Sequence, residues 1–479
     1  MEIILLLITL LIAGVLSFFA KKTKHSGLIT LWGQILAAFF ALLLCFKITA
    51  AGPVTLLNFF YADALSAFFL FLISISAVSS AFYSKWYFKD EENTGFYNAL
   101  FNLFVFSMYL VVTVNNLGML WVSVEITTLA SAFLVGYRNN KTSVEAAWKY
   151  IIICSVGITL ALFGIILLSY TATADAGIKS LNWTELNAGK NILNPMVVKA
   201  AFIFIVVGFG TKAGLAPMHN WLPDAHSQAP SPISALLSGV LLKASIYAII
   251  RFLIIAAGSV GFSFCGNILG LFGLISLGIA AFFILVQKDL KRLLAYSSVE
   301  HIGLISVGFY FGGKIGIFGA LFHSLNHAMA KGLMFFSSGN IIKKYGTNNI
   351  NQIKGALETV PLAATAAFIG MFALAGMPPF SIFMSEFAIL MSGFKGGYYY
   401  SASAVLLFLA ITFGALIYQF GGMLYGKKPA NLEKTKEPLD IAVFFGVIIV
   451  VMLIFGLHLP EFVNTIISNA VDVVMGAGS

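Results

Sequence analysis

The feature of this sequence that most constrains its fold is a succession of long apolar runs separated by short polar loops. A helix needs about 20 mostly apolar residues to cross a bilayer, where only helices and closed barrels satisfy their own backbone hydrogen bonds. By that criterion the 479 residues contain about fourteen such segments. We therefore expect an all-α polytopic membrane protein with about fourteen transmembrane helices, and not a string of soluble domains.

The composition supports a membrane protein and argues against several other classes. Charged residues make up 10% of the chain, against about 25% in soluble domains, and the mean hydropathy is +0.95. The net charge of +9 does not indicate nucleic-acid binding, because most Lys and Arg residues lie in short loops between apolar runs. The three cysteines are isolated and form no C-x-x-C pair, so we expect no iron–sulfur cluster, zinc site or disulfide framework in this chain.

Loop charges predict the orientation of the chain in the membrane. The loops after odd-numbered spans carry 18 basic residues: Lys21, Lys22, Lys24, Lys85, Lys89, Arg138, Lys141, Lys149, Lys288, Lys291, Arg292, Lys343, Lys344, Lys354, Lys427, Lys428, Lys434 and Lys436. The loops after even-numbered spans carry 6: Lys47, Lys179, Lys190, Lys199, Lys314 and Lys395. Because basic loops stay in the cytoplasm, we expect a multi-pass protein of the inner (cytoplasmic) membrane with both termini outside. The first apolar run precedes its lysines, which favours a retained span over a cleaved signal peptide.

Two of the expected spans contain the same helix-breaking pattern, A-G-x-x-P, at residues 213–217 and 375–379. Proline frees a backbone carbonyl, and such breaks at membrane depth are tolerated only inside a protein or beside a wet cavity. The breaks fall in spans seven and twelve, and an offset of five spans predicts two inverted five-helix repeats around a transport site. The alternative is that each Gly-Pro only kinks a packed helix. We expect helices 1–3 in residues 1–95, the repeats in 96–257 and 258–426, and helix 14 with a tail in 427–479.

Several ionisable residues lie inside these spans. A charge at the membrane centre costs about 2.5–3.5 kcal/mol on insertion scales, so such residues are functional candidates. They are Glu125, Lys212, Lys243, Glu300, His301, His323, His327, Lys331 and Glu386. His323, His327 and Lys331 follow one another at intervals of four and therefore share one helix face. Acid, base and imidazole groups alternating across several helices are typical of a proton relay, with a movable Glu125–Lys212 pair as an electrostatic switch.

Several of these candidates also have a purely structural interpretation. Glu125 and Lys212 could form a static ion pair, and the histidines could be satisfied polar groups between helices. Lys331 could line a cavity without titrating, and Glu386 could snorkel or accept backbone donors freed by the prolines before it. We expect Arg251, near the outer end of its span, to snorkel towards water.

Two further residues precede span eight on the expected cytoplasmic side. Asp224 and His226, within HNWLPDAHSQAPSP, could admit protons to Lys212 and Lys243, or could simply cap two helices. No H-E-x-x-H motif is present, and His301 is the only good candidate for a matching haem ligand. We therefore expect no metal, cofactor or catalytic residue in this chain.

Three motifs make a family resemblance recognisable. GTKAGLAPMHNWLPDAHSQAPSPISALLSGVLLKASIYAIIR, KRLLAYSSVEHIG and FHSLNHAMAKGLMFF resemble the signature of antiporter-like subunits, over roughly residues 60–430. Such subunits occur in respiratory complex I, in Mrp-type cation/proton antiporters and in group 4 membrane-bound hydrogenases. The resemblance implies fourteen core helices, with inverted five-helix repeats over spans 4–8 and 9–13.

The resemblance also implies roles for single residues. Glu125 matches the acid of the fifth span, Lys212 matches the lysine beside the broken seventh span, and Lys243 matches the central lysine of the eighth. Lys331 and Glu386 match positions that are ionisable in some members. His301, His323 and His327 match polar positions on the central hydrophilic axis.

One detail narrows the choice within this superfamily. V-E-H-I-G, with Glu300 before His301, is more similar to the hydrogenase-4 component F group than to complex I. The resemblance implies a proton- or sodium-translocating subunit of a redox complex, best matched by a membrane-bound hydrogenase whose nickel–iron and iron–sulfur centres lie in a peripheral arm. A stand-alone Mrp-type antiporter, a complex I subunit and an unrelated transporter of organic solutes remain the alternatives.

Overall fold

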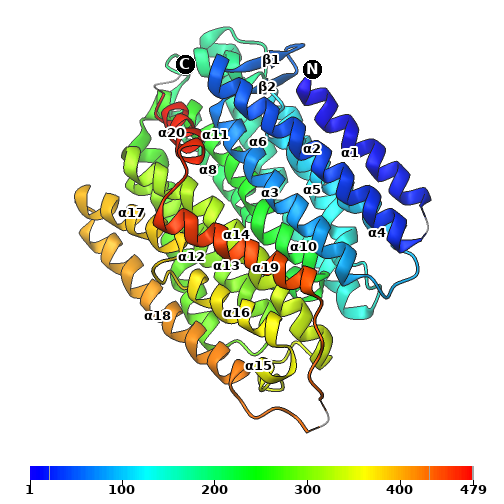
Figure 1. Cartoon of the computed structure of the whole chain (residues 1–479). Coiled ribbons are helices and arrows are strands. Elements are labelled where there is room, and N and C mark those ends of the chain that lie inside the picture. Colours follow the sequence, from blue (N-terminus) through cyan, green and yellow to red (C-terminus); the bar gives the residue numbers. More distant parts are fainter. Residues whose placement is uncertain (21, 431, 477–479) are drawn as a thin grey trace.

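The computed structural model describes residues 1–20, 22–430 and 432–476, and is almost entirely helical (Figure 1). Its helices are α1 (Glu2–Phe19), α2 (Thr23–Ala51), α3 (Ala64–Tyr87), α4 (Gly95–Val111), α5 (Leu117–Val135), α6 (Lys141–Ala176), α7 (Trp183–Ala188), α8 (Pro195–Ala213), α9 (Trp221–Gln228), α10 (Ser231–Leu236), the π-helical turn η1 (Leu237–Leu241), α11 (Leu242–Val260), α12 (Phe262–Val286), α13 (Leu290–Phe311), α14 (Gly313–Tyr345), α15 (Ala356–Thr359), α16 (Pro361–Leu374), α17 (Ser381–Lys395), α18 (Tyr399–Leu424), α19 (Leu439–Leu457) and α20 (Glu461–Met475). Two short strands, β1 (Val54–Leu56) and β2 (Phe60–Ala62), pair antiparallel with Thr55 opposite Tyr61.

Ten helical segments of the described chain are long and apolar enough to cross a membrane. They are α1, α2, α3, α5, α6, α8, the continuous α10–η1–α11 segment, α12, α18 and α19. Helices α4 and α16 are apolar but shorter. The expected all-α polytopic fold is confirmed, whereas the number of fourteen spans stays a prediction.

Both helix breaks expected from the sequence are present. The first lies between α8 and α9, and the second lies between α16 and α17. Gly214 (φ +81°) and Gly376 (φ +70°) adopt left-handed backbone conformations there, which glycine reaches without a Cβ clash. Pro217 and Pro379 follow, and neither has the N–H that a continuing helix would need. The inverted relation of the two repeats, and the domain boundaries drawn from it, stay predictions.

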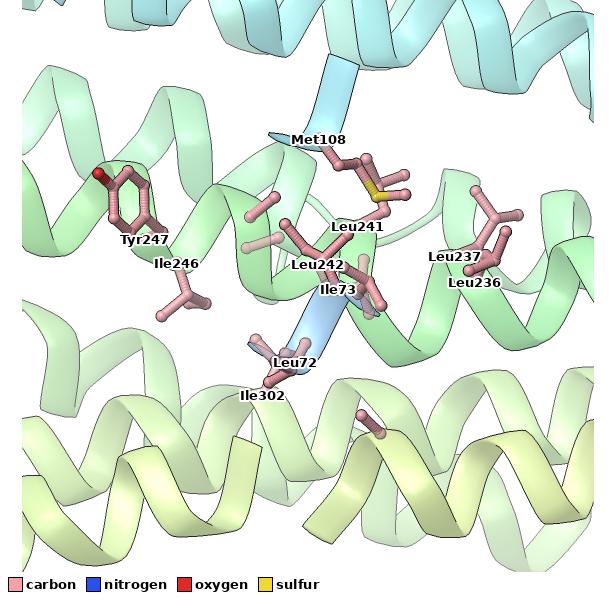
Figure 2. Packing of buried hydrophobic residues seen from close by; sticks show 14 of the residues in the cluster. Leu72, Ile73, Met108, Leu236, Leu237, Leu241, Leu242, Ile246, Tyr247 and Ile302 are labelled. Carbon is pink, nitrogen blue, oxygen red and sulfur yellow. The ribbon is translucent and has the colours of Figure 1, made fainter. Parts of the chain in front are cut away.

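The middle of the bundle is formed by α10–η1–α11, α13 and α14. The α10–η1–α11 segment is 94% buried over its most apolar window, against 28% for α18 and 22% for α19. Figure 2 shows Leu241 and Leu242 of the central segment beside Ile73 of α3 and Met108 of α4, all of them in one buried cluster. Charged groups on these central helices are therefore remote from lipid, which is where charges in a membrane protein are tolerated.

The chain after the last expected span is helical rather than a simple tail. Helix α20 packs against α3 and α14, and Asp472 pairs with Lys314 at 3.3 Å. Its buried residues include Val463, Ile466 and Ala470, which follow the three-to-four-residue spacing of an amphipathic helix. In Figure 1, α20 lies at the same end of the bundle as the start of α1. Lys21, which contributed to the loop charge count, and residues 477–479 of the expected tail lie outside the described residues.

Candidate functional site

A first polar cluster joins α5, α6 and α8. Glu125 accepts hydrogen bonds from the hydroxyls of Ser155 at 2.8 Å and Thr128 at 3.3 Å. The Thr128 hydroxyl in turn accepts a hydrogen bond from the Lys212 ammonium at 2.9 Å. Glu125 and Lys212 are therefore connected through one hydroxyl, and do not form the direct ion pair that the sequence analysis considered.

Lys212 is fully buried and its remaining partners are aromatic. It donates to the hydroxyl of Tyr150, and its ammonium lies 4.5 Å from the centre of that ring and 6.0 Å from the centre of the Trp221 ring. The helix break sets this position: α8 ends one residue later, and a cation is favoured near a helix C-terminus. The Trp221 indole donates to the Thr211 carbonyl at 2.8 Å, which holds α9 against the end of α8.

Lys243 lies directly after the π-helical turn η1. Its ammonium donates to the Ser238 carbonyl at 2.5 Å and contacts Nδ1 of His327. A π-helical turn takes carbonyls out of the regular helical ladder, and such turns are frequent at functional sites. The Ser238 hydroxyl is 2.7 Å from that of Ser298, so the turn is also connected to α13.

Three histidines continue from Lys243 towards α17. The rings of His327 and His301 have centres 4.6 Å apart, and His301 Nδ1 lies 2.9 Å from His323 Nε2. His323 Nδ1 lies 3.0 Å from the hydroxyl of Ser385 on α17. These groups form a second cluster that extends from α11 across α13 and α14 to α17.

The other candidates on the second half are also buried. Lys331 donates to the Leu294 carbonyl at 2.6 Å and to the Ser297 hydroxyl. Glu300 is 2% exposed, and its Oε2 has no hydrogen-bond partner among the described residues. Glu386 lies against the second helix break, where a Cβ on Gly376 would stand 2.0 Å from its Oε2.

Among the described residues, His301, His323 and Glu386 form the one group of three that could bind a metal. Each offers a ligand atom, and the three atoms lie within 4.8 Å of one another. Two imidazoles and a carboxylate are a ligand set that zinc accepts. In this structure, however, the two imidazoles contact each other, and His323 also contacts Ser385. The geometry therefore fits a hydrogen-bonded chain as well as it fits a metal site. The expectation of no metal stays a prediction.

Asp224 and His226 face different surroundings although only one residue separates them. Asp224 pairs with Arg292 and, at 3.4 Å, with Lys149, and it lines an open cavity of about 290 Å³. His226 is completely buried and stacks on Phe335 with ring centres 5.1 Å apart. Neither of its ring nitrogens has a hydrogen-bond partner in the described part of the chain. Only Asp224 is thus in contact with the surface.

The expectation that Arg251 snorkels is wrong. Its side chain is 3% exposed and makes two hydrogen bonds to the Asp63 carboxylate, at 2.7 and 2.6 Å. Tyr247 and Ser66 accept further hydrogen bonds from it, and the Trp183 ring centre lies 4.5 Å away. Arg251 stays inside because a buried guanidinium with a bidentate carboxylate partner is satisfied without water.

Comparison with known proteins identifies relatives over most of the chain. Residues 114–414 match the family described as "NADH:quinone oxidoreductase/Mrp antiporter, TM". A hydrogenase-4 component F homolog of Methylacidiphilum infernorum is 38% identical over 381 residues, which cover 77% of this chain and 80% of that protein.

Solved structures show the same fold over the whole chain. A chain of the membrane-bound sulfane sulfur reductase, an archaeal respiratory membrane complex, superposes with a TM-score of 0.88 at 24% identity, covering 99% of this chain and 98% of that one. A chain of the Mrp complex from Dietzia sp. DQ12-45-1b superposes with a TM-score of 0.86 at 20% identity, covering 100% and 99%.

Proposed function

Because the chain belongs to the NADH:quinone oxidoreductase/Mrp antiporter transmembrane family, we propose that it translocates protons, or sodium ions, as a membrane subunit of a multi-subunit redox-driven complex. The complex would be of the group 4 membrane-bound hydrogenase kind. The observation that carries this proposal is the series of ionisable groups that runs from the half-buried Glu125 on α5, through buried lysines and histidines, to the buried Glu386 on α17. Within that series His301 contacts His323 directly, and Lys212 is connected to Glu125 through the Thr128 hydroxyl.

The lysines in this series suit proton exchange because their hydrogen-bond partners are uncharged. Lys212 is bound by hydroxyls and aromatic rings, and Lys243 by a carbonyl and an imidazole. An ammonium group in a buried site costs free energy that the neutral amine avoids, so a small change in a neighbouring charge can change its protonation. In this proposal a proton arriving at Glu125 changes the protonation of Lys212, which in turn changes the protonation of Lys243. The histidines then pass a proton towards Glu386.

No hydrogen bond joins the Lys212 cluster to the Lys243 cluster among the described residues. Proton transfer between them would therefore use water. Asp224 would collect protons at the surface, and His226 would receive them inside. Redox cofactors, nickel–iron and iron–sulfur, would belong to the partner subunits of a peripheral arm, and other membrane subunits would flank this chain in the inner membrane. The lysine-rich end of the bundle would face the cytoplasm.

A second candidate function is that of a subunit in a stand-alone Mrp-type cation/proton antiporter. It is favoured by the fold likeness to a chain of the Dietzia Mrp complex. The same buried residues would serve in it, without redox partners. Purification of the native complex distinguishes the two, because only the redox assembly would bring nickel–iron and iron–sulfur subunits with it. A complex I assembly would instead bring a subunit that oxidises NADH.

The proposed function is tested by replacing the central lysine. Proton and sodium uptake, driven by the intact complex in vesicles, is compared between wild type and Lys243→Ala. We expect uptake to be lost while assembly and electron transfer to a soluble acceptor are retained. Unchanged uptake in an assembled complex would remove Lys243 from the mechanism and leave this chain as a structural neighbour of the pump.

A further inference from the structure

A basic cavity lies at one end of the bundle, where the ends of α3 and α14 meet the segment before α19. Its volume is about 320 Å³. Four lysines line it, Lys89, Lys343, Lys344 and Lys436, together with the carboxylates of Asp90 and Glu437. These lysines are among those that predict this end of the chain to be cytoplasmic.

The two carboxylates in the basic cavity are already engaged. Asp90 pairs with Lys343 at 2.7 Å, and this lysine holds the pKa of Asp90 below its usual value. Glu437 accepts hydrogen bonds from the backbone N–H groups of Leu362 and Ala363, at 2.7 and 3.1 Å, and so caps the start of α16. Lys89, Lys344 and Lys436 have no carboxylate within ion-pair distance in the part of the chain that the structure describes.

The same cavity is lined by three buried polar groups that lack a hydrogen-bond partner among the described residues. They are the indole N–H of Trp86, the amide Nδ2 of Asn340 and the hydroxyl of Thr435. Asn340 is 5% exposed, and its Oδ1 accepts a hydrogen bond from Tyr83 at 2.6 Å. Its Nδ2 lies towards the Glu437 carboxylate without forming a hydrogen bond of regular geometry, so it still has a proton to donate. Buried donors are nearly always satisfied in proteins. Three unused donors beside three unpaired lysines fit an anion with several acceptor oxygens, such as a phosphate.

An apolar groove of about 110 Å³ lies farther along the same three helices. It is lined by Ser79 of α3, Met329 of α14, and Val447 and Val451 of α19, among others. Ser79 precedes Trp86 by seven residues, which corresponds to about 10 Å along a helix.

Between the basic cavity and the apolar groove lie two half-buried aromatic rings. Phe82 of α3 and Phe444 of α19 stack there with ring centres 4.9 Å apart. A phosphate group and a hydrocarbon chain of one molecule could thus occupy the cavity and the groove together, with the chain lying over these rings.

We propose that the basic cavity and the apolar groove together bind one anionic phospholipid. The phosphate accepts hydrogen bonds from Trp86, Asn340 and Thr435 and is paired with the lysines. An acyl chain passes over Phe82 and Phe444 into the groove. The cytoplasmic leaflet is the one that carries anionic lipids, which matches the orientation expected from the loop charges. The lipid would fix α19 to α3 and α14.

The headgroup half of the proposal is tested on the purified complex after detergent exchange. Phosphatidylglycerol retained per complex is measured by mass spectrometry, and its affinity is measured by titration in phosphatidylcholine vesicles. The variant is the triple change Lys89→Gln, Lys344→Gln and Lys436→Gln. Because each lysine near an anionic lipid contributes about 1 kcal/mol, we expect binding on the order of 100-fold weaker.

A matched control changes the same net charge at the same end of the bundle. Lys24→Gln, Lys288→Gln and Lys427→Gln replace exposed lysines that do not line the cavity, and should leave the bound phosphatidylglycerol unchanged. Equal loss in both triple variants would mean general attraction to an anionic surface, and would overturn a specific site.

The acyl-chain half is tested with two valines of α19 that are similarly exposed. Val447 lines the groove and is 57% exposed, while Val450 does not line it and is 52% exposed. Val447→Phe fills the groove and should lower retained lipid severalfold, whereas Val450→Phe should not. Equal lipid retention in the two variants would mean that no acyl chain occupies the groove, and would overturn the assignment to a phospholipid. Release of the lipid by inorganic phosphate alone would overturn it as well, because it would show a site for free phosphate.

Discussion

Two regions of this molecule bury cationic side chains in opposite ways. Arg251 of α11 is held by the two carboxylate oxygens of Asp63, the residue before α3, at 2.7 and 2.6 Å. Lys212, Lys243 and Lys331 are equally buried, but no carboxylate lies within ion-pair distance of them among the described residues. Hydroxyls, carbonyls and one imidazole are their hydrogen-bond partners.

The difference separates a fixed charge from a changeable one. A guanidinium stays protonated in proteins and needs a permanent counter-charge when it is buried. A lysine amine can lose its proton, so neutral partners can satisfy it in either state. The Arg251–Asp63 pair is therefore suited to holding helices together, whereas the three lysines are suited to exchanging protons.

The largest effect is expected from breaking the fixed pair. Asp63→Asn keeps an acceptor for the backbone N–H of Ser66 but leaves Arg251 without a counter-charge. Removing one partner of a buried ion pair costs about 3–5 kcal/mol. We expect the variant to lower the melting temperature of the purified complex and the amount of this chain assembled in membranes.

A second substitution distinguishes loss of the charge partner from loss of the carboxylate itself. Adding Arg251→Met to Asp63→Asn removes both charges, and should restore much of the stability and assembly, because apolar replacements of buried ion pairs are often tolerated. If Asp63→Asn alone is as stable as wild type, the pair does not hold the fold and the contrast with the lysines is lost.

A smaller effect on assembly, but a large one on transport, is expected when a changeable charge is made permanent. Lys212→Arg keeps the positive charge and prevents its loss near neutral pH. We expect the complex to assemble while ion uptake in vesicles falls by about 100-fold or more, the lower end of the effect typical of positioned proton-transfer groups. Lys199→Arg on the same helix is the matched control, because Lys199 is exposed, and it should transport normally. Normal uptake by Lys212→Arg would mean that Lys212 need not lose its proton.

The sequence predicted the buried lysines and the helix breaks well, for a physical reason. Lys212 or Lys243 in an apolar run stands out because charge in hydrocarbon is costly. The two A-G-x-x-P patterns stand out because proline inside an apolar run removes a helix hydrogen-bond donor, and glycine shortly before it can adopt a left-handed conformation that ends the helix. These signals are local in the sequence and need no knowledge of packing.

The partners of these residues could not be predicted in the same way. Asp63 precedes α3, and its place in the sequence indicates a helix cap, a role that it does fill. Nothing near it in the sequence indicates that it also binds Arg251, which lies 188 residues away. Thr128 and Tyr150 are hydroxyl residues of a kind found on most membrane helices, and only the packing of α5, α6 and α8 shows that they contact Lys212. Arg251 was misjudged because its counter-charge was not visible in its own segment.

The smallest effect is expected at the hydroxyl that connects acid to lysine. Thr128→Val keeps the shape of the side chain but removes the only group that bonds both Glu125 and Lys212 in the described structure. A single hydrogen bond contributes about 0.5–1.5 kcal/mol, so uptake should fall by about twofold to tenfold. Thr127→Val on the same helix is the control, because the Thr127 hydroxyl bonds only the Val124 carbonyl among the described residues, and Thr128→Ser should restore uptake. Full uptake in Thr128→Val would show that Glu125 influences Lys212 through space or water, and that neutral partners of the lysines fix their position without transmitting charge.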